Sequence, residues 1–238
     1  MHRRRSLACA ILASTLAFVA GCSGGGSERK LLEDFFRASR LRDNVTLGNF
    51  ATATFDPRTH GTVQSLEIVT VGDERVTPLP LKQYVKAVED AKAADAAFST
   101  EKRAYQNANI IAIDRVLKTA AAGKPVSAKD RSVKEAWDKW STDQVNHKKA
   151  VSAAQRQLND ARGIAELSLS RPNGATIDAT QYDGQMVTKE VTINATVRDP
   201  KGQTAAQPLK AMLQRALMKD ENGKELKGRW IVTSVNPA

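Results

Sequence analysis

The chain has 238 residues and a formal net charge of +10, from 36 lysines and arginines against 26 aspartates and glutamates. Two cysteines and three histidines are too few for a disulfide framework or for a zinc site built from several thiolates or imidazoles. This length suits one or two domains, and the basic charge predicts only non-specific attraction to anionic lipids or acidic polymers.

The first 21 residues have the order of a secretory signal peptide. Arg3 to Arg5 form a basic start, and an apolar run from Leu7 to Ala20 follows, too short to span a bilayer comfortably. Removal of residues 1–21 takes away three arginines and Cys9, which lowers the formal net charge to +7.

The end of this segment, Val19-Ala20-Gly21-Cys22, resembles the lipobox of bacterial lipoproteins. The resemblance implies cleavage between Gly21 and Cys22, lipidation of Cys22 with palmitate-like chains, and a lipid-anchored protein of the cell envelope. The alternative is an ordinary signal peptide cut near Ala20, with Cys22 incidental. By analogy with lipoprotein sorting, Ser23 implies the periplasmic face of the outer membrane in a cell with two membranes. A lipidated Cys22 leaves no thiol for redox chemistry or catalysis.

Residues 22–27 are predicted to be the lipidated cysteine and a flexible Gly/Ser tether, and residues 28–79 the first part of an α+β domain. The segment from Ser27 to Asp43 predicts a helix capped by Ser27. Its apolar residues cluster on one side: Leu31, Leu32, Phe35, Phe36 and Leu41. Residues 56–61 predict a turn, and the alternating segment 62–72 predicts a strand.

Residues 80–171 are predicted to form an inserted helical hairpin. Residues 80–122 and 127–170 have helix-forming compositions, and Gly123 with Pro125 separates them. Two antiparallel helices of roughly 40 residues would be on the order of 60 Å long. A seven-residue period predicts a coiled-coil seam. Its positions are Val88, Ala91, Asp95, Phe98, Lys102, Tyr105, Asn109, Ala112 and Val116 in the first arm, and Val133, Trp137, Trp140, Gln144, His147, Val151, Ala154, Leu158, Ala161 and Ala165 in the second.

Three seam residues raise functional alternatives. Trp137 and Trp140 are interpreted as packing residues near the hairpin tip, and they become the best candidates for partner contact if they are exposed. His147 is interpreted as a seam residue rather than as a ligand or base.

Residues 172–238 are predicted to complete the α+β domain as a β-meander. One face of the segment 184–198 carries Val187, Lys189, Val191, Ile193, Ala195 and Val197. Residues 208–219 fit a helix by composition, but their place between two turns favours a strand, so both remain open. The segment GRWIVTSV predicts a Trp-containing final strand.

The predicted fold class is α+β, with an N-terminal helix on a curved antiparallel sheet and an inserted long antiparallel helical hairpin. The segments LLEDFFRASRLRD, VTINATVRD and GRWIVTSV resemble the cystatin-like or NTF2-like fold, over about half of the mature chain. The resemblance implies a scaffold that binds a ligand or a partner, but the family's catalytic residues cannot be mapped onto this sequence.

The leading functional hypothesis is a membrane-anchored, non-enzymatic binding or scaffold module whose hairpin contacts a protein or cell-wall partner. We expect no catalytic residue, metal, cofactor or nucleic acid, since no phosphate loop, H-E-x-x-H or G-x-S-x-G motif occurs. The first alternative is a carrier of lipid or metabolite, which a sheet interior filled by Phe35, Phe36, Ile193 and Trp230 would contradict. The second is an NTF2-like enzyme with a cleft around His60, where Asp56 offers an acid/base partner.

Overall fold

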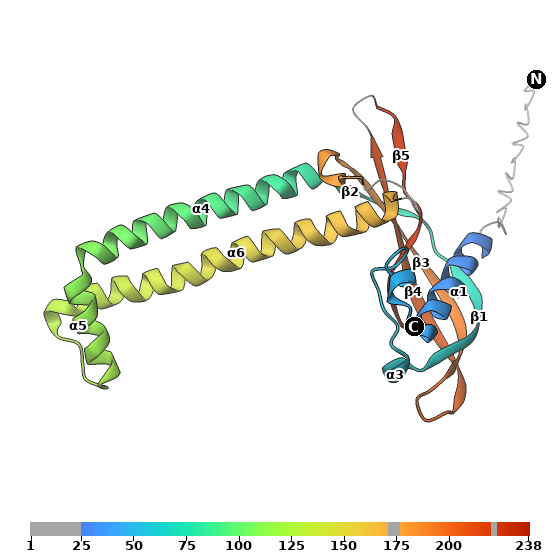
Figure 1. The fold of residues 1–238 in the computed structure, drawn as a ribbon, viewed down its shortest axis with the longest axis horizontal. Helices are drawn as coiled ribbons and strands as arrows, with labels where there is room; N and C mark the ends of the chain where they lie inside the picture. Colours follow the sequence, from blue (N-terminus) through green and yellow to red (C-terminus); the bar gives the residue numbers. More distant parts are fainter. Residues whose placement is uncertain (1–24, 171–176, 220–222) are drawn as a thin grey trace, which may run out of the picture.

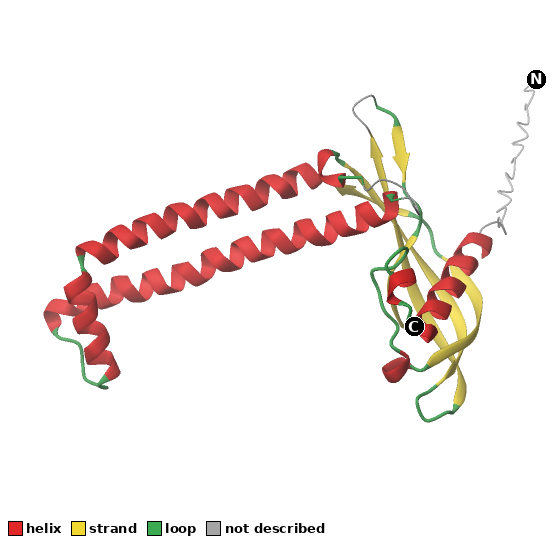
Figure 2. Cartoon of the chain, viewed as in Figure 1, coloured by secondary structure: helices red, strands yellow, loops and turns green. Residues whose placement is uncertain are grey.

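The computed structural model describes residues 25–170, 177–219 and 223–238. The signal peptide, the lipobox and Cys22 lie outside the described residues. The fold class is α+β as predicted: a helix lies on a curled antiparallel sheet, and a long helical hairpin projects from one end of that sheet (Figures 1 and 2).

The sheet is built around two long neighbouring strands that pair along their whole length. Its strands are β1 (Thr62–Val71), β2 (Arg75–Leu79), β3 (Gly184–Arg198), β4 (Thr204–Lys219), β5 (Glu225–Lys227) and β6 (Ile231–Pro237). Two strands, β1 and β2, pair in succession with β3, and β6 and β5 pair in the same way with β4. The line of strands on each side of the β3–β4 pair is therefore broken once. Residues 72–74 separate β1 from β2, and residues 228–230 separate β5 from β6.

The ambiguous segment 208–219 is a strand, in agreement with its hairpin context. Each residue of β3 from Gly184 to Arg198 has a partner in β4, and this pairing outweighs the helical composition of the segment. The predicted Trp-containing strand needs a correction, because Trp230 lies in the break before β6 rather than in the strand itself.

The two halves of the sheet bury opposite faces. Because side chains alternate along a strand, residues 191, 193, 195 and 197 of β3 share one face, while Met186 points to the other. The first face packs against Leu32 and Phe35 of α1 (Gly25–Leu41). Met186 and its partner Ala216 pack instead against the base of the hairpin. All six residues predicted for one face of β3 are buried, Lys189 included.

The first helix differs from its prediction at both ends. It begins at Gly25, so Ser27 lies inside it rather than at its cap, and residues 25–27 belong to the helix rather than to a tether. Its last residue, Leu41, is 68 % exposed, because at 100° per residue it lies on the side of the helix opposite Leu32; Arg42 follows with a left-handed φ of 54°. The other four predicted apolar residues face the core.

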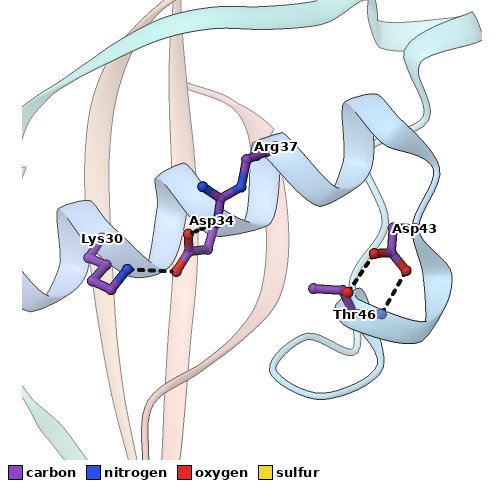
Figure 3. A network of polar contacts seen from close by, with 5 residues as sticks. All are labelled: Lys30, Asp34, Arg37, Asp43 and Thr46. Carbon is purple, nitrogen blue, oxygen red and sulfur yellow. Dashed lines mark hydrogen bonds and ion pairs between the residues drawn. The ribbon is translucent and has the colours of Figure 1, made fainter.

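Polar contacts on α1 and after it are shown in Figure 3. Asp34 accepts hydrogen bonds from Lys30 at 3.3 Å and from Arg37 at 2.5 Å on the exposed side of α1. The carboxylate of Asp43 caps the short helix α2 (Asn44–Leu47) through the backbone N–H of Thr46. The predicted turn at residues 56–61 contains another short helix, α3 (Pro57–His60).

The hairpin consists of three helices: α4 (Leu81–Ala108), α5 (Ile110–Ala121) and α6 (Arg131–Leu169). All predicted seam residues are buried or half-buried, which confirms the seven-residue period. The first arm is not one continuous helix, however. Asn109 donates its side-chain amide to the Tyr105 carbonyl at 3.0 Å, and its backbone leaves the helical conformation. The chain then turns, and α5 lies across the far end of the hairpin (Figure 1).

Candidate functional site

The hairpin is joined to the sheet by buried hydrogen bonds around Ser168. Its hydroxyl donates to the Arg229 carbonyl at 2.8 Å and accepts from the Ala216 backbone N–H at 3.0 Å. Gly228 passes so close that a Cβ there would lie 2.1 Å from the Ser168 hydroxyl oxygen. Leu81, at the base of the other arm, is fully buried. The base of the hairpin is therefore part of a shared core, which fixes the direction in which the hairpin points.

Trp137, Trp140 and His147 lie in the hairpin seam. The Trp140 ring is 5.2 Å from the Phe98 ring, and His147 stacks on Phe98 at 4.5 Å between ring centroids. Trp137 lies beneath Lys102, whose ammonium is 5.2 Å from the indole centre. These contacts support the packing interpretation for all three residues, and the two tryptophans are half-buried.

The end of the hairpin, which we call the head and define as residues 110–130, carries the exposed apolar side chains that sequence reasoning missed. Ile110, Ile111 and Leu117 of α5 are 58 %, 76 % and 47 % exposed, while Ile113 on the same helix is buried. The signal was present in the run Ile110-Ile111-Ala112-Ile113, which is unusually apolar for an arm rich in alanine and lysine. A continuous helix would have placed this run along the shaft.

A buried carboxylate holds the head together. Arg115 donates to Asp130 through two nitrogens, at 2.9 and 2.6 Å, and Ser127 donates its hydroxyl to the same carboxylate at 2.8 Å. These hydrogen bonds, that from Arg115 first, lower the pKa of Asp130 from 3.8 to about 2. The return loop is thus pinned to α5, and the head has a defined shape.

A second polar cluster lies inside the body. The Lys189 ammonium pairs with Glu28 at the start of α1 and lies 4.0 Å from the centre of the Trp230 ring. Arg215 covers the same ring at 4.3 Å and pairs with Glu74 at 2.8 Å. Burial alone would raise the pKa of Glu28, but hydrogen bonds from Lys189 and Ser27 outweigh it and hold this pKa below 4.5. The ion pair links the first turn of α1 to the centre of β3.

The interior of the sheet is filled by its own side chains. Phe35 and Ile193 are fully buried, Phe36 is nearly so, and Trp230 packs against the same core. These are the four residues whose packing bears on the alternative of a lipid or metabolite carrier. A groove of about 370 Å³ lies on the surface between α1 and β1, and Arg29, Arg37 and Leu66 help to line it.

The structure does not bring Asp56 and His60 together as an acid/base pair. The Asp56 carboxylate accepts from the Arg58 backbone N–H at 2.9 Å and so caps α3, while the His60 ring packs on Phe55 at 5.0 Å. Within the described residues, no three His, Cys, Asp or Glu side chains are arranged to hold a metal ion.

None of the helices in the described part of the chain has both the length and the apolar character needed to cross a bilayer. In comparisons with known proteins, no family model, no curated protein and no solved structure matches the chain. The resemblances to bacterial lipoproteins and to the NTF2-like fold therefore stay predictions, and function has to be argued from the geometry.

Proposed function

We propose that this chain is a lipid-anchored lipoprotein of the cell envelope that acts as a non-enzymatic binding or scaffold module. The observation that carries the proposal is the hairpin, in which α6 alone has 39 residues and a length of about 60 Å. The hairpin is rooted in the core of the body and bears an exposed apolar head at its free end. Such an arm holds a binding surface at a fixed distance from the body.

The second part of the proposal is the anchor. Cys22 would carry the lipid, with cleavage after Gly21, and the described part of the chain begins three residues after Cys22, in helix α1. The body would therefore lie close to its own membrane. In a cell with two membranes, we place the anchor on the periplasmic face of the outer membrane.

Metabolic labelling with palmitate tests the anchor, and the chain supplies its own control. Cys22→Ser should abolish both the labelling and the release of the mature form. Cys9→Ser should remain labelled, because Cys9 lies in the removed segment. A Cys22→Ser protein that still takes up palmitate would contradict the anchor.

The scaffold role is tested by comparing the full chain with a form that lacks residues 92–154. The two ends of this deletion lie opposite each other in the hairpin, since Phe98 contacts His147 and Lys102 contacts Gln144. The shortened protein should stay folded and anchored but lose the partners that the full chain retains. Equal retention of partners by both forms would place the binding surface on the body instead.

A further inference from the structure

The exposed face of α5 is amphiphilic. At 100° per residue, Ile110, Leu117 and Ala121 fall in one row, and Ile111 lies about 100° around the helix from that row, above Lys118. Asp114 lies on the same face, but its carboxylate is paired with Lys118 at 2.7 Å. The face therefore presents large aliphatic side chains next to a neutralised ion pair.

A basic hollow adjoins these aliphatic side chains. Its volume is about 450 Å³ and its opening is wide, and its walls include Arg115, Lys118, Lys124 and Ile111, together with Asp114, which pairs with Lys118. Lys124 forms no ion pair with the described part of the chain. Of the two acidic residues in the head, Asp114 is paired with Lys118 and Asp130 is buried against Arg115. The accessible charge of the head is therefore positive.

We propose that the head binds the surface of an anionic lipid bilayer. An anionic phospholipid offers both chemistries that the head presents: a phosphate for the basic hollow and acyl chains for the isoleucines. The aliphatic side chains would reach the boundary between headgroups and chains, while the Asp114–Lys118 pair stays hydrated. This inference rests on the proposed function and names the partner of the hairpin, a second membrane facing the anchored one.

A second copy of the chain fits this surface less well. Two heads in contact would bring lysines of the same sign together, which disfavours association. Nothing on the head offers the acidic groups that would compensate, since its carboxylates are already paired within the same head.

A vesicle-capture experiment with the full-length lipidated protein tests the proposal. The protein is inserted into neutral phosphatidylcholine vesicles, which are then mixed with fluorescent vesicles of phosphatidylcholine and phosphatidylglycerol. We expect capture of the anionic vesicles but not of neutral ones, and weaker capture as salt screens the lysines.

Two pairs of variants identify the surface. Lys124→Glu should weaken capture roughly thirtyfold, since it changes the charge by two and each charge near an anionic surface contributes about 1 kcal/mol. Ile111→Asp should weaken it by about the same factor, because it removes apolar contact with the bilayer. The matched controls lie on the shaft of α6: Lys148→Glu makes the same charge change, and Val145→Asp replaces an aliphatic side chain that is 50 % exposed.

The outcomes separate this inference from the proposed function. Equal capture of neutral and anionic vesicles, or equal loss in head and shaft variants, would overturn binding of the head to lipid. A chain without a lipid anchor would fail to stay with the neutral vesicles, and its flotation with the anionic vesicles would still test the head. If no vesicles are captured and the head variants lose a protein partner instead, binding of the head to lipid is overturned and the scaffold role stays intact.

Discussion

The charge of Lys189 is buried in the middle of an otherwise apolar strand face, and only 6 % of the residue is exposed. A buried charge is expensive unless it is paired, and Glu28 supplies the partner while Trp230 covers the ammonium. The pair joins two parts of the chain 161 residues apart and thereby fixes where α1 starts. Its value lies in this specificity more than in net stability.

The buried ion pair gives a prediction with a defined pH dependence. Glu28→Gln leaves the Lys189 ammonium buried without a counter-charge and should lower the free energy of unfolding by about 3 kcal/mol near neutral pH. Because folding lowers the pKa of Glu28, its contribution is present above pH 4.5 and is lost as the pH falls through the lowered pKa. Urea unfolding at a series of pH values should show the two proteins converging in acid.

The matched control for the Glu28–Lys189 pair is an exposed ion pair on the same helix, α1. Arg29 and Glu33 lie 3.7 Å apart with half-exposed side chains, so Glu33→Gln should change stability by less than about 0.5 kcal/mol. A constant difference in the free energy of unfolding between wild type and Glu28→Gln down to acid pH would show that loss of the ionised pair does not cause the destabilisation.

At the scale of the element, the seven-residue period predicted the hairpin seam position by position. It succeeded because the seam depends on side-chain spacing alone, even where polar residues such as Lys102 and Gln144 interrupt it and bond to each other at 2.6 Å. It failed at Asn109, where the backbone leaves the helical conformation without any glycine or proline to mark the break. The exposed isoleucines of the head, and with them the candidate binding surface, followed from that one break.

The hairpin seam should be most sensitive at Phe98. This side chain is buried between Trp140 and His147, so Phe98→Ala should cost about 3 kcal/mol through lost contacts and a cavity. Hydrogen exchange should then become faster in the middle of α4 and α6, while the sheet stays protected. Val145→Ala, a change at a half-exposed position of the same shaft, should leave exchange nearly unchanged; equal effects would contradict the seam.

At the scale of the whole molecule, the fold class could be predicted because helix and strand periods change clearly along the chain. The two cores on opposite faces of the sheet could not be predicted from the sequence. Which face of β3 is covered at each end depends on the breaks at residues 72–74 and 228–230, and short Gly-containing segments of this kind look like ordinary turns in the sequence. The position of Trp230 was missed for the same reason.

The two cores predict opposite results for two truncations. Deleting residues 81–171 removes Leu81, Ala165 and Ser168 from the core at the base of the hairpin, and the body should unfold or lose most of its stability. Deleting residues 92–154 leaves these residues in place and should preserve a cooperative unfolding transition by circular dichroism. Stable folding of both forms would show that the base of the hairpin contributes little to the body.

The continuous pairing of β3 with β4 also has a mechanical consequence. The hairpin is rooted at one end of these strands, and α1 is packed against the other. A pull applied to β3 at one end of the pair and to β4 at the other would load their backbone hydrogen bonds together, in shear, rather than opening them one after another. A body built in this way resists tension along its own length.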